Sequence, residues 1–93
     1  MSKGGEPVEK HIILGVHITD RLKHAVEVQG VFTEYGRHIK TRLGLHEVDK
    51  SHNSPNGVVL IEAYGDEAKC LEMAAKLAAI EGVEVQKMIF GHY

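Results

Sequence analysis

Apolar residues recur with two different periods along the 93 residues of this chain, and the order of these periods limits the folds that it can adopt. Segments with a period of two, which is typical of half-buried strands, are interleaved with segments of helical period. The predicted strands are residues 10–19, 38–48, 58–64 and 83–90, and the predicted helices are residues 20–35 and 67–82. This order predicts an α+β fold, the ferredoxin-like βαββαβ sandwich. Its four-stranded antiparallel sheet has the spatial order fourth, first, third, second strand and carries both helices on one face.

The predicted helices begin at residues whose side chains can accept hydrogen bonds from free backbone N–H groups. Thr19 or Asp20 can cap the first helix in this way, and Asp66 can cap the second. Gly36 is predicted to close the first helix and Gly82 the second.

The first predicted helix has one broad apolar face. Its members are Leu22, Ala25, Val26, Val28, Phe32 and Tyr35. Gln29 lies near the middle of this face, so we expect its amide to have a hydrogen-bond partner in the folded protein.

The composition is typical of a single domain that needs no disulfide. Residues 1–9 are interpreted as a flexible lead-in to one domain over residues 10–93. One cysteine cannot form an internal disulfide, so we expect a reducing, cytoplasmic setting. We find no signal sequence and no apolar run that could span a membrane. The net charge of -2 has the wrong sign for a dedicated nucleic-acid binder, so we expect no direct binding of nucleic acid.

The stretch HIKTRLGLHEV, residues 38–48, alternates polar and apolar side chains. The alternation predicts that one set faces the core: Ile39, Thr41, Leu43 and Leu45. The opposite set would be a row of histidines and cations on the open face of the sheet: His38, Lys40, Arg42 and His46. Either this is an ordinary half-buried strand with a polar outer face, or the row binds a ligand.

The open face of the predicted sheet also carries apolar side chains. These are Ile13, Val58, Leu60, Met88 and Phe90. Exposed apolar patches usually mark interfaces, so we expect a homo-dimer or homo-tetramer, or a regulatory protein partner. The alternative is a monomer with a slightly apolar surface.

Histidines on this face suggest a transition-metal ion as the one candidate cofactor. His17 and His46 lie at the same end of the predicted sheet, separated by two inter-strand spacings, or about 9.6 Å. Each imidazole nitrogen lies about 2 Å from a bound metal, so this pair alone is too far apart to chelate one ion. A metal site would therefore include His52 from the polar loop at residues 49–56, or ligands from a second subunit. The alternative is that these are solvated surface histidines, because the chain has no tight ligand spacing such as HxH.

A second candidate site lies where the first strand ends and the first helix begins. Thr19, Asp20 and Arg21 occupy this turn. Free N–H groups at a helix start attract small anions, and Arg21 adds a positive charge. With Arg42, these residues form the predicted ligand-binding set. The alternative for Thr19 and Asp20 is a simple helix cap.

No catalytic set follows from the spacing of the residues. We find no Ser–His–Asp or Cys–His spacing and no glycine-rich phosphate loop between a strand and a helix. We also identify no carboxylate placed by spacing to support a histidine, so an enzyme with a histidine acid or base is the least favoured alternative. Cys70 lies among alanines in the second helix and is interpreted as a packing residue.

Three segments resemble a known family. They are VQGVFTEYGRHI, TRLGLHE and KLAAIEGVEVQKM, with Arg42-Leu43-Gly44 and Gly82-Val83 as the most recognisable points. These segments are similar to those of the small ACT-like proteins known as iron-only hydrogenase system regulators, and the resemblance covers nearly everything from residue 12 to residue 89. It implies an ACT-like, ferredoxin-like regulatory domain over residues 10–93, with a regulatory role and no defined reaction.

The predicted layout also resembles the C-terminal sensing domain of nickel-responsive repressors. Those proteins carry metal-ligating histidines on the second strand, and by this resemblance His46 occupies a comparable place. The sequence departs from their pattern because it lacks the HxH spacing and has Asn56-Gly57 where they have a cysteine. We also expect no N-terminal DNA-binding segment of the kind that those repressors carry.

The sequence thus predicts a non-enzymatic regulatory or sensor module, related to iron-only hydrogenase systems, that acts as an oligomer and responds to a small ligand or a metal ion. The alternative is a protein–protein interaction module whose apolar sheet face binds a partner without any effector.

Overall fold

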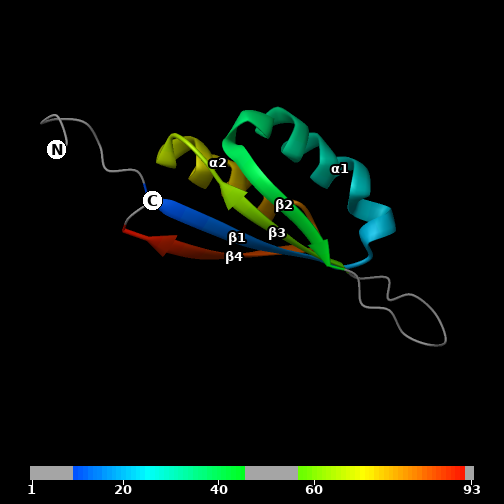
Figure 1. Cartoon of the computed structure of the whole chain (residues 1–93). Helices are drawn as coiled ribbons and strands as arrows, with labels where there is room; N and C mark the ends of the chain where they lie inside the picture. Colours follow the sequence, from blue (N-terminus) through cyan, green and yellow to red (C-terminus); the bar gives the residue numbers. More distant parts are fainter. Residues whose placement is uncertain (1–9, 46–56, 92–93) are drawn as a thin grey trace, which may run out of the picture.

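The structure is a computed structural model that describes residues 10–45 and 57–91. Its elements follow the predicted order (Figure 1). They are β1 (His11–Ile18), α1 (Arg21–Glu34), a short 3₁₀ helix η1 (Gly36–His38), β2 (Ile39–Leu45), β3 (Gly57–Ala63), α2 (Glu67–Ala78) and β4 (Val83–Phe90). The predicted lead-in at residues 1–9 and the predicted loop at residues 49–56 lie outside the described residues. None of the helices described is long and apolar enough to cross a membrane.

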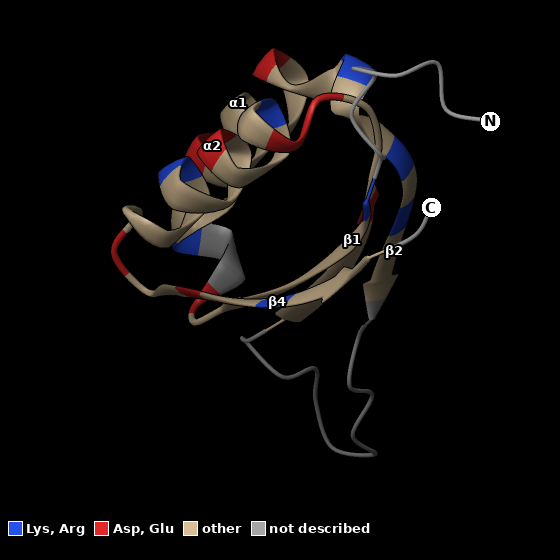
Figure 2. Cartoon of the chain, turned by 90° about the vertical axis from the view of Figure 1, so that its left-hand side faces the viewer, with Lys and Arg blue, Asp and Glu red and all other residues tan. Residues whose placement is uncertain are grey.

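The four strands form one antiparallel sheet in the order β2-β3-β1-β4. Both helices lie on the concave side of the curved sheet (Figure 2). This strand order, with the helices on one face, is that of the ferredoxin-like α+β sandwich. The fold predicted from the periodicity is therefore confirmed.

The core lies between the helices and the two central strands. Every second residue of β1 is buried, namely Ile12, Leu14, Val16 and Ile18. The helices contribute Val28, Phe32, Cys70, Met73, Ala74 and Leu77, the residue after α1 contributes Tyr35, and β3 contributes Ile61 and Ala63. Burial of each large apolar side chain stabilises the fold by about 1.5–3 kcal/mol. Cys70 is 1% exposed, which confirms its predicted packing role.

The phase predicted for the second strand is wrong beyond Ile39. Ile39 lies opposite Ala63 and Thr41 lies opposite Glu62, so two steps along β2 match one step along β3. Such a bulge moves every later side chain of a strand to the other face. Thr41 and Leu43 therefore lie on the open face of the sheet, and Arg42 lies on the face that carries the helices.

The two helices begin differently. Asp66 caps α2 as predicted, because its carboxylate accepts a hydrogen bond of 2.8 Å from the N–H of Ala68. Asp20 occupies the N-cap position of α1 but makes no side-chain capping hydrogen bond, which corrects the predicted cap at this residue. Its φ of 53° is left-handed, and its backbone carbonyl accepts hydrogen bonds from the N–H groups of Lys23 and His24. A residue in the left-handed region directs its side chain away from the geometry that the usual cap requires.

The predicted apolar face of α1 is too broad. Val28, Phe32 and Tyr35 are buried as expected, but Val26 is 84% exposed. Val26 and Val28 are two positions apart, and two steps of about 100° place them on opposite sides of a helix. Val26 therefore faces solvent in the chain described.

The second helix ends earlier than predicted. It ends at Ala78, and Gly82 lies in the turn that leads into β4. Gly82 has a φ of 82°, and a Cβ atom there would lie 2.9 Å from Nε2 of His24. The carbonyl of Gly82 accepts a hydrogen bond of 2.8 Å from the N–H of Thr19. This glycine therefore joins the start of β4 to the β1–α1 turn and to a buried histidine that the sequence did not single out.

Candidate functional site

A cleft of about 170 Å³ opens between α1 and the β2 side of the sheet. Its lining residues are Ile18, Ala25, Val28, Gln29, Phe32, Arg42 and Val59. The helix-facing positions of β2 explain the opening. Arg42 and Gly44 occupy them in place of apolar side chains, and a Cβ at Gly44 would meet no atom within 4 Å. The bulge in β2 thus leaves the space beneath α1 unfilled at this edge of the sheet.

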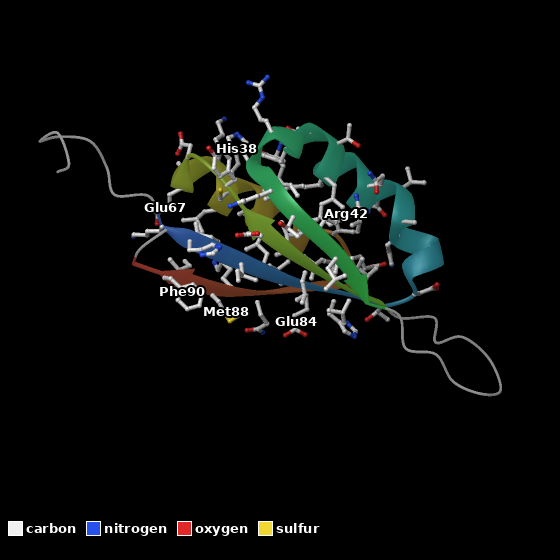
Figure 3. All side chains as sticks on the ribbon, viewed as in Figure 1. His38, Arg42, Glu67, Glu84, Met88 and Phe90 are labelled. Atoms are coloured by element: carbon white, nitrogen blue, oxygen red, sulfur yellow. The ribbon has the colours of Figure 1, made fainter. Side chains whose placement is uncertain are left out.

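Arg42 reaches across this cleft to α1 (Figure 3). Its Nη2 donates a hydrogen bond of 2.9 Å to Oε1 of Gln29. Its guanidinium carbon lies 4.5 Å from the ring centroid of Phe32, within the range of a cation–π contact. The prediction that the amide of Gln29 has a hydrogen-bond partner is confirmed.

The charge of Arg42 has no carboxylate counterpart in the part of the chain that the structure describes. The ion pairs found there involve other cations: Lys10, His11, His24, Lys69 and Lys76. A guanidinium group has five N–H donors, and Gln29 accepts from one nitrogen only. The cleft therefore combines an apolar floor with one cation at its rim that still has donors to offer.

The wall of the cleft formed by α1 is held against α2 by a polar cluster. The buried Tyr35 donates a hydrogen bond from its hydroxyl to the carboxylate of Glu72. This bond, followed by burial, raises the pKa of Tyr35. The same bond lowers the pKa of Glu72 and outweighs the opposite effect of burial on that carboxylate. Lys76 lies 5.3 Å from the centroid of the Tyr35 ring and forms a 2.8 Å ion pair with Glu34. The cluster joins the C-terminal end of α1 to the middle and last turn of α2 and so helps to hold α1 in place over the sheet.

The predicted ligand-binding set is only partly brought together. Arg42 lines the cleft, whereas Thr19 and Asp20 lie beyond Ile18, outside the lining residues. The N–H of Thr19 donates to Gly82 and is thereby occupied. The side chain of Arg21 lies outside the described residues. The residues that sequence reasoning missed at this site are Gln29 as a partner of Arg42 and Phe32 as its stacking surface. The sequence signal that could have revealed them was Gln29, a polar residue within an apolar helix face.

The predicted metal residues are not seen as a group. His17 is exposed on the open face of the sheet, paired in register with Val58 on β3 and Glu84 on β4. His46 and His52 lie outside the described residues. Within residues 10–45 and 57–91, no three histidine, cysteine or acidic side chains are grouped as they would be around a metal ion. The metal site thus stays a prediction.

The open face carries a polar network that spacing did not predict. Nε2 of His11 lies 2.7 Å from Oε2 of Glu62, and Oγ1 of Thr41 donates a 2.8 Å hydrogen bond to Oε1 of Glu62. The Thr41 hydroxyl, and after it His11, holds the pKa of Glu62 below its ordinary value. A histidine with a supporting carboxylate therefore exists in this fold, because three neighbouring strands bring together residues that are distant in sequence.

Apolar side chains surround this network. Leu43, Met88 and Phe90 are about half exposed, at 52%, 53% and 50%. Phe90, Met88 and Glu84 project from β4 away from the helices (Figure 3). The register pairs His11 with Phe90 and Ile13 with Met88, so the open-face positions predicted for Met88 and Phe90 are confirmed.

Solved structures with similar folds include the following two. One is an uncharacterized protein, TM1266, from Thermotoga maritima; it is 23% identical, covers 87% of this chain and 98% of its own, and has a TM-score of 0.73. The other is CPII, a nitrogen regulatory PII-like protein from Thiomonas intermedia K12 bound to ADP, AMP and bicarbonate. It is 12% identical, with coverage of 91% and 97% and a TM-score of 0.52. At these identities the comparisons show a shared fold. No family model matches the chain, and no curated protein matches it.

Proposed function

We propose that this chain is a non-enzymatic regulatory module that binds a small ligand in the cleft between α1 and β2. The observation that carries the proposal is Arg42, a cation without a carboxylate partner in the described chain, at the rim of an apolar cleft. Pockets that combine an apolar lining with a few polar groups are the usual sites of small-molecule binding. The fold shared with a PII-like regulatory protein whose structure contains small molecules agrees with this proposal.

In this proposal the module regulates an iron-only hydrogenase system, because the chain resembles the regulators of such systems. The chemistry of Cys70 agrees with a non-enzymatic role, because burial raises the pKa of its thiol and disfavours the nucleophilic thiolate. His11 and Glu62 form the one histidine–carboxylate pair across strands in the described chain, and they lie on the open sheet face outside the lining of the cleft. The module acts as a homo-oligomer, with the half-exposed Leu43, Met88 and Phe90 as its contact surface.

A ligand panel tests the proposal. Small carboxylates, amino acids, nucleotides and divalent metal ions are added separately to ¹⁵N-labelled protein, and amide chemical shifts are followed. We expect one class to give saturable shifts at Ala25, Gln29 and Val59. Ala25→Phe should abolish them because the larger side chain fills the cleft, whereas Ala68→Phe, an equivalent change at an exposed position of α2, should not. Saturable shifts of the cleft residues by no class at all would refute a ligand-binding module.

A second candidate function is favoured by the exposed apolar side chains of the open face. In this alternative, the chain is an interaction module that binds a protein partner through that face and has no effector. Native mass spectrometry distinguishes the ligand-binding module from the interaction module. Spectra are recorded of the protein alone, with each member of the ligand panel, and with nickel, zinc or iron under reducing conditions. An oligomer that ignores every addition and dissociates in Met88→Glu favours the interaction module. Stoichiometric uptake of a metal that is lost in His46→Ala would instead make a metal the effector.

A further inference from the structure

We infer that the ligand of the cleft between α1 and β2 is a small monocarboxylate with a short aliphatic body. The inference rests on the proposed function, because it names the ligand class of the same site. In this arrangement the carboxylate lies against Arg42 and Gln29 at the rim, and the aliphatic body lies on the floor.

The floor of the cleft suits an aliphatic group. The apolar surface that a ligand can reach there comes mainly from the exposed Ala25 and the half-buried Val59. Beneath them Val28, Phe32 and Ile18 are 4%, 3% and 6% exposed and close the floor. Apart from Gln29 and Arg42, every residue of the lining is apolar. A ligand group that rests there loses contact with water without leaving a polar atom unsatisfied.

The rim of the cleft suits a carboxylate. A guanidinium group presents a planar fork of N–H donors that matches the two oxygens of a carboxylate. Arg42 is already oriented by its stacking on Phe32 and by its hydrogen bond to Oε1 of Gln29. Because Oε1 of Gln29 faces Arg42, the amide nitrogen of the same side chain is a second donor beside the guanidinium. Two neighbouring donors of this kind hold a carboxylate with little further ordering of the protein.

The charge of the lining selects against amino acids. An amino acid brings an ammonium group next to its carboxylate, and that group requires an acceptor. The lining contains no carboxylate, and its one side-chain amide oxygen already accepts from Arg42. An ammonium group held there would lie beside the Arg42 cation and would lose its own hydration without compensation.

The size of the cleft selects against nucleotides. Pockets for drug-sized ligands usually have volumes of about 300–1,000 Å³, whereas this cleft has about 170 Å³. The single cation of the lining also cannot balance the several negative charges of a nucleoside diphosphate. The ligand is therefore smaller than a nucleotide and carries one negative charge.

Four probes with related shapes test this inference by NMR titration of the full chain. Isovalerate has the predicted carboxylate and a branched body, isovaleramide has the same shape without charge, valine adds an α-ammonium group, and ADP is the polyanionic control. We expect isovalerate to give saturable shifts at Val28, Gln29 and Val59. Isovaleramide and valine should bind at least tenfold more weakly, and ADP should give no saturable shifts at these residues.

Two arginine variants make the test specific. Arg42→Gln should weaken isovalerate binding at least tenfold, whereas Arg37→Gln, which removes an exposed arginine from η1, should leave binding unchanged. Arg42→Lys keeps the charge without the fork and should bind with intermediate affinity. The amide spectrum of each variant shows whether it remains folded.

The outcomes distinguish a wrong ligand class from a wrong function. Equal losses in Arg42→Gln and Arg37→Gln, or valine binding as tightly as isovalerate, would overturn the carboxylate assignment. Saturable binding of a nucleotide or a metal at the cleft residues would also overturn it, yet would leave the cleft as a ligand site. Absence of binding by every member of the panel would instead remove the proposed function itself.

Discussion

The two halves of this sandwich have the same topology and different packing. In the second half, β3–α2–β4, the helix begins with a side-chain cap at Asp66 and buries Cys70, Met73, Ala74 and Leu77. In the first half, β1–α1–β2, the helix begins at a left-handed Asp20 without such a cap, and Val26 faces solvent. β4 pairs with β1 over eight residues without interruption, whereas β2 contains a bulge. Both halves contribute to the core, but α2 packs closely on the sheet, whereas the β2 edge of the first half leaves space beneath α1 that a ligand can occupy.

The largest contrast between the halves is expected from one truncation in each helix. Leu77→Ala removes a side chain that is 0% exposed in α2, and the resulting cavity should lower the free energy of unfolding by about 2–5 kcal/mol. Val26→Ala removes a side chain that is 84% exposed in α1 and should change stability by less than about 0.5 kcal/mol. Urea denaturation of both variants measures the difference. Similar losses in the two would contradict the exposed position of Val26 on α1.

Gly82 joins the two halves, so we expect its substitution to cause the second-largest loss of stability. Gly82→Ala places a Cβ at a φ of 82° and 2.9 Å from Nε2 of His24, and we expect a loss of about 1–3 kcal/mol. The double variant with His24→Ala relieves the contact and leaves the backbone strain. A double-mutant cycle therefore measures how much of the loss comes from the histidine. A cycle with no coupling energy would mean that the backbone strain alone accounts for the loss.

The cap of α2 should have a smaller effect. Asp66→Ala removes the acceptor for the N–H of Ala68 and should lower the free energy of unfolding by about 1 kcal/mol. Asp66→Ser keeps a side-chain acceptor and should retain most of the stability. Thermal unfolding of both variants checks this order, and a serine variant as unstable as the alanine variant would contradict a capping role.

The smallest expected effect is a change in pH dependence on the open face. Hydrogen bonds from Thr41 and His11 lower the pKa of Glu62 in the folded state. Glu62 therefore contributes stability above its ordinary pKa of 4.5, and this contribution is lost as the pH falls through the lowered pKa. We expect the urea midpoint of the wild type to fall more steeply with acid than that of Glu62→Gln. Parallel curves would show that the network does not stabilise the ionised carboxylate.

Much of the fold could be predicted because the relevant signals are local. The alternation of apolar residues in β1 identified its buried face, and the register of β4 agrees with the predicted positions of Met88 and Phe90. Gln29 within an apolar helix face required a partner, and the structure supplies one. The site was less predictable, because Arg42 was assigned to the open face and its stacking partner Phe32 to the core alone.

The sequence by itself determined the order of the elements, the fold and the side of β1 that is buried. These depend on hydrophobic period and on the handedness of connections, which the chain carries locally. Only the tertiary structure decided which side of the sheet Arg42 occupies. A bulge exists only relative to a partner strand, so the shift between Ile39 and Thr41 has no signature in the period of β2 alone. The same holds for His11 and Glu62, since the pairing of β1 with β3 is what brings their side chains within 2.7 Å.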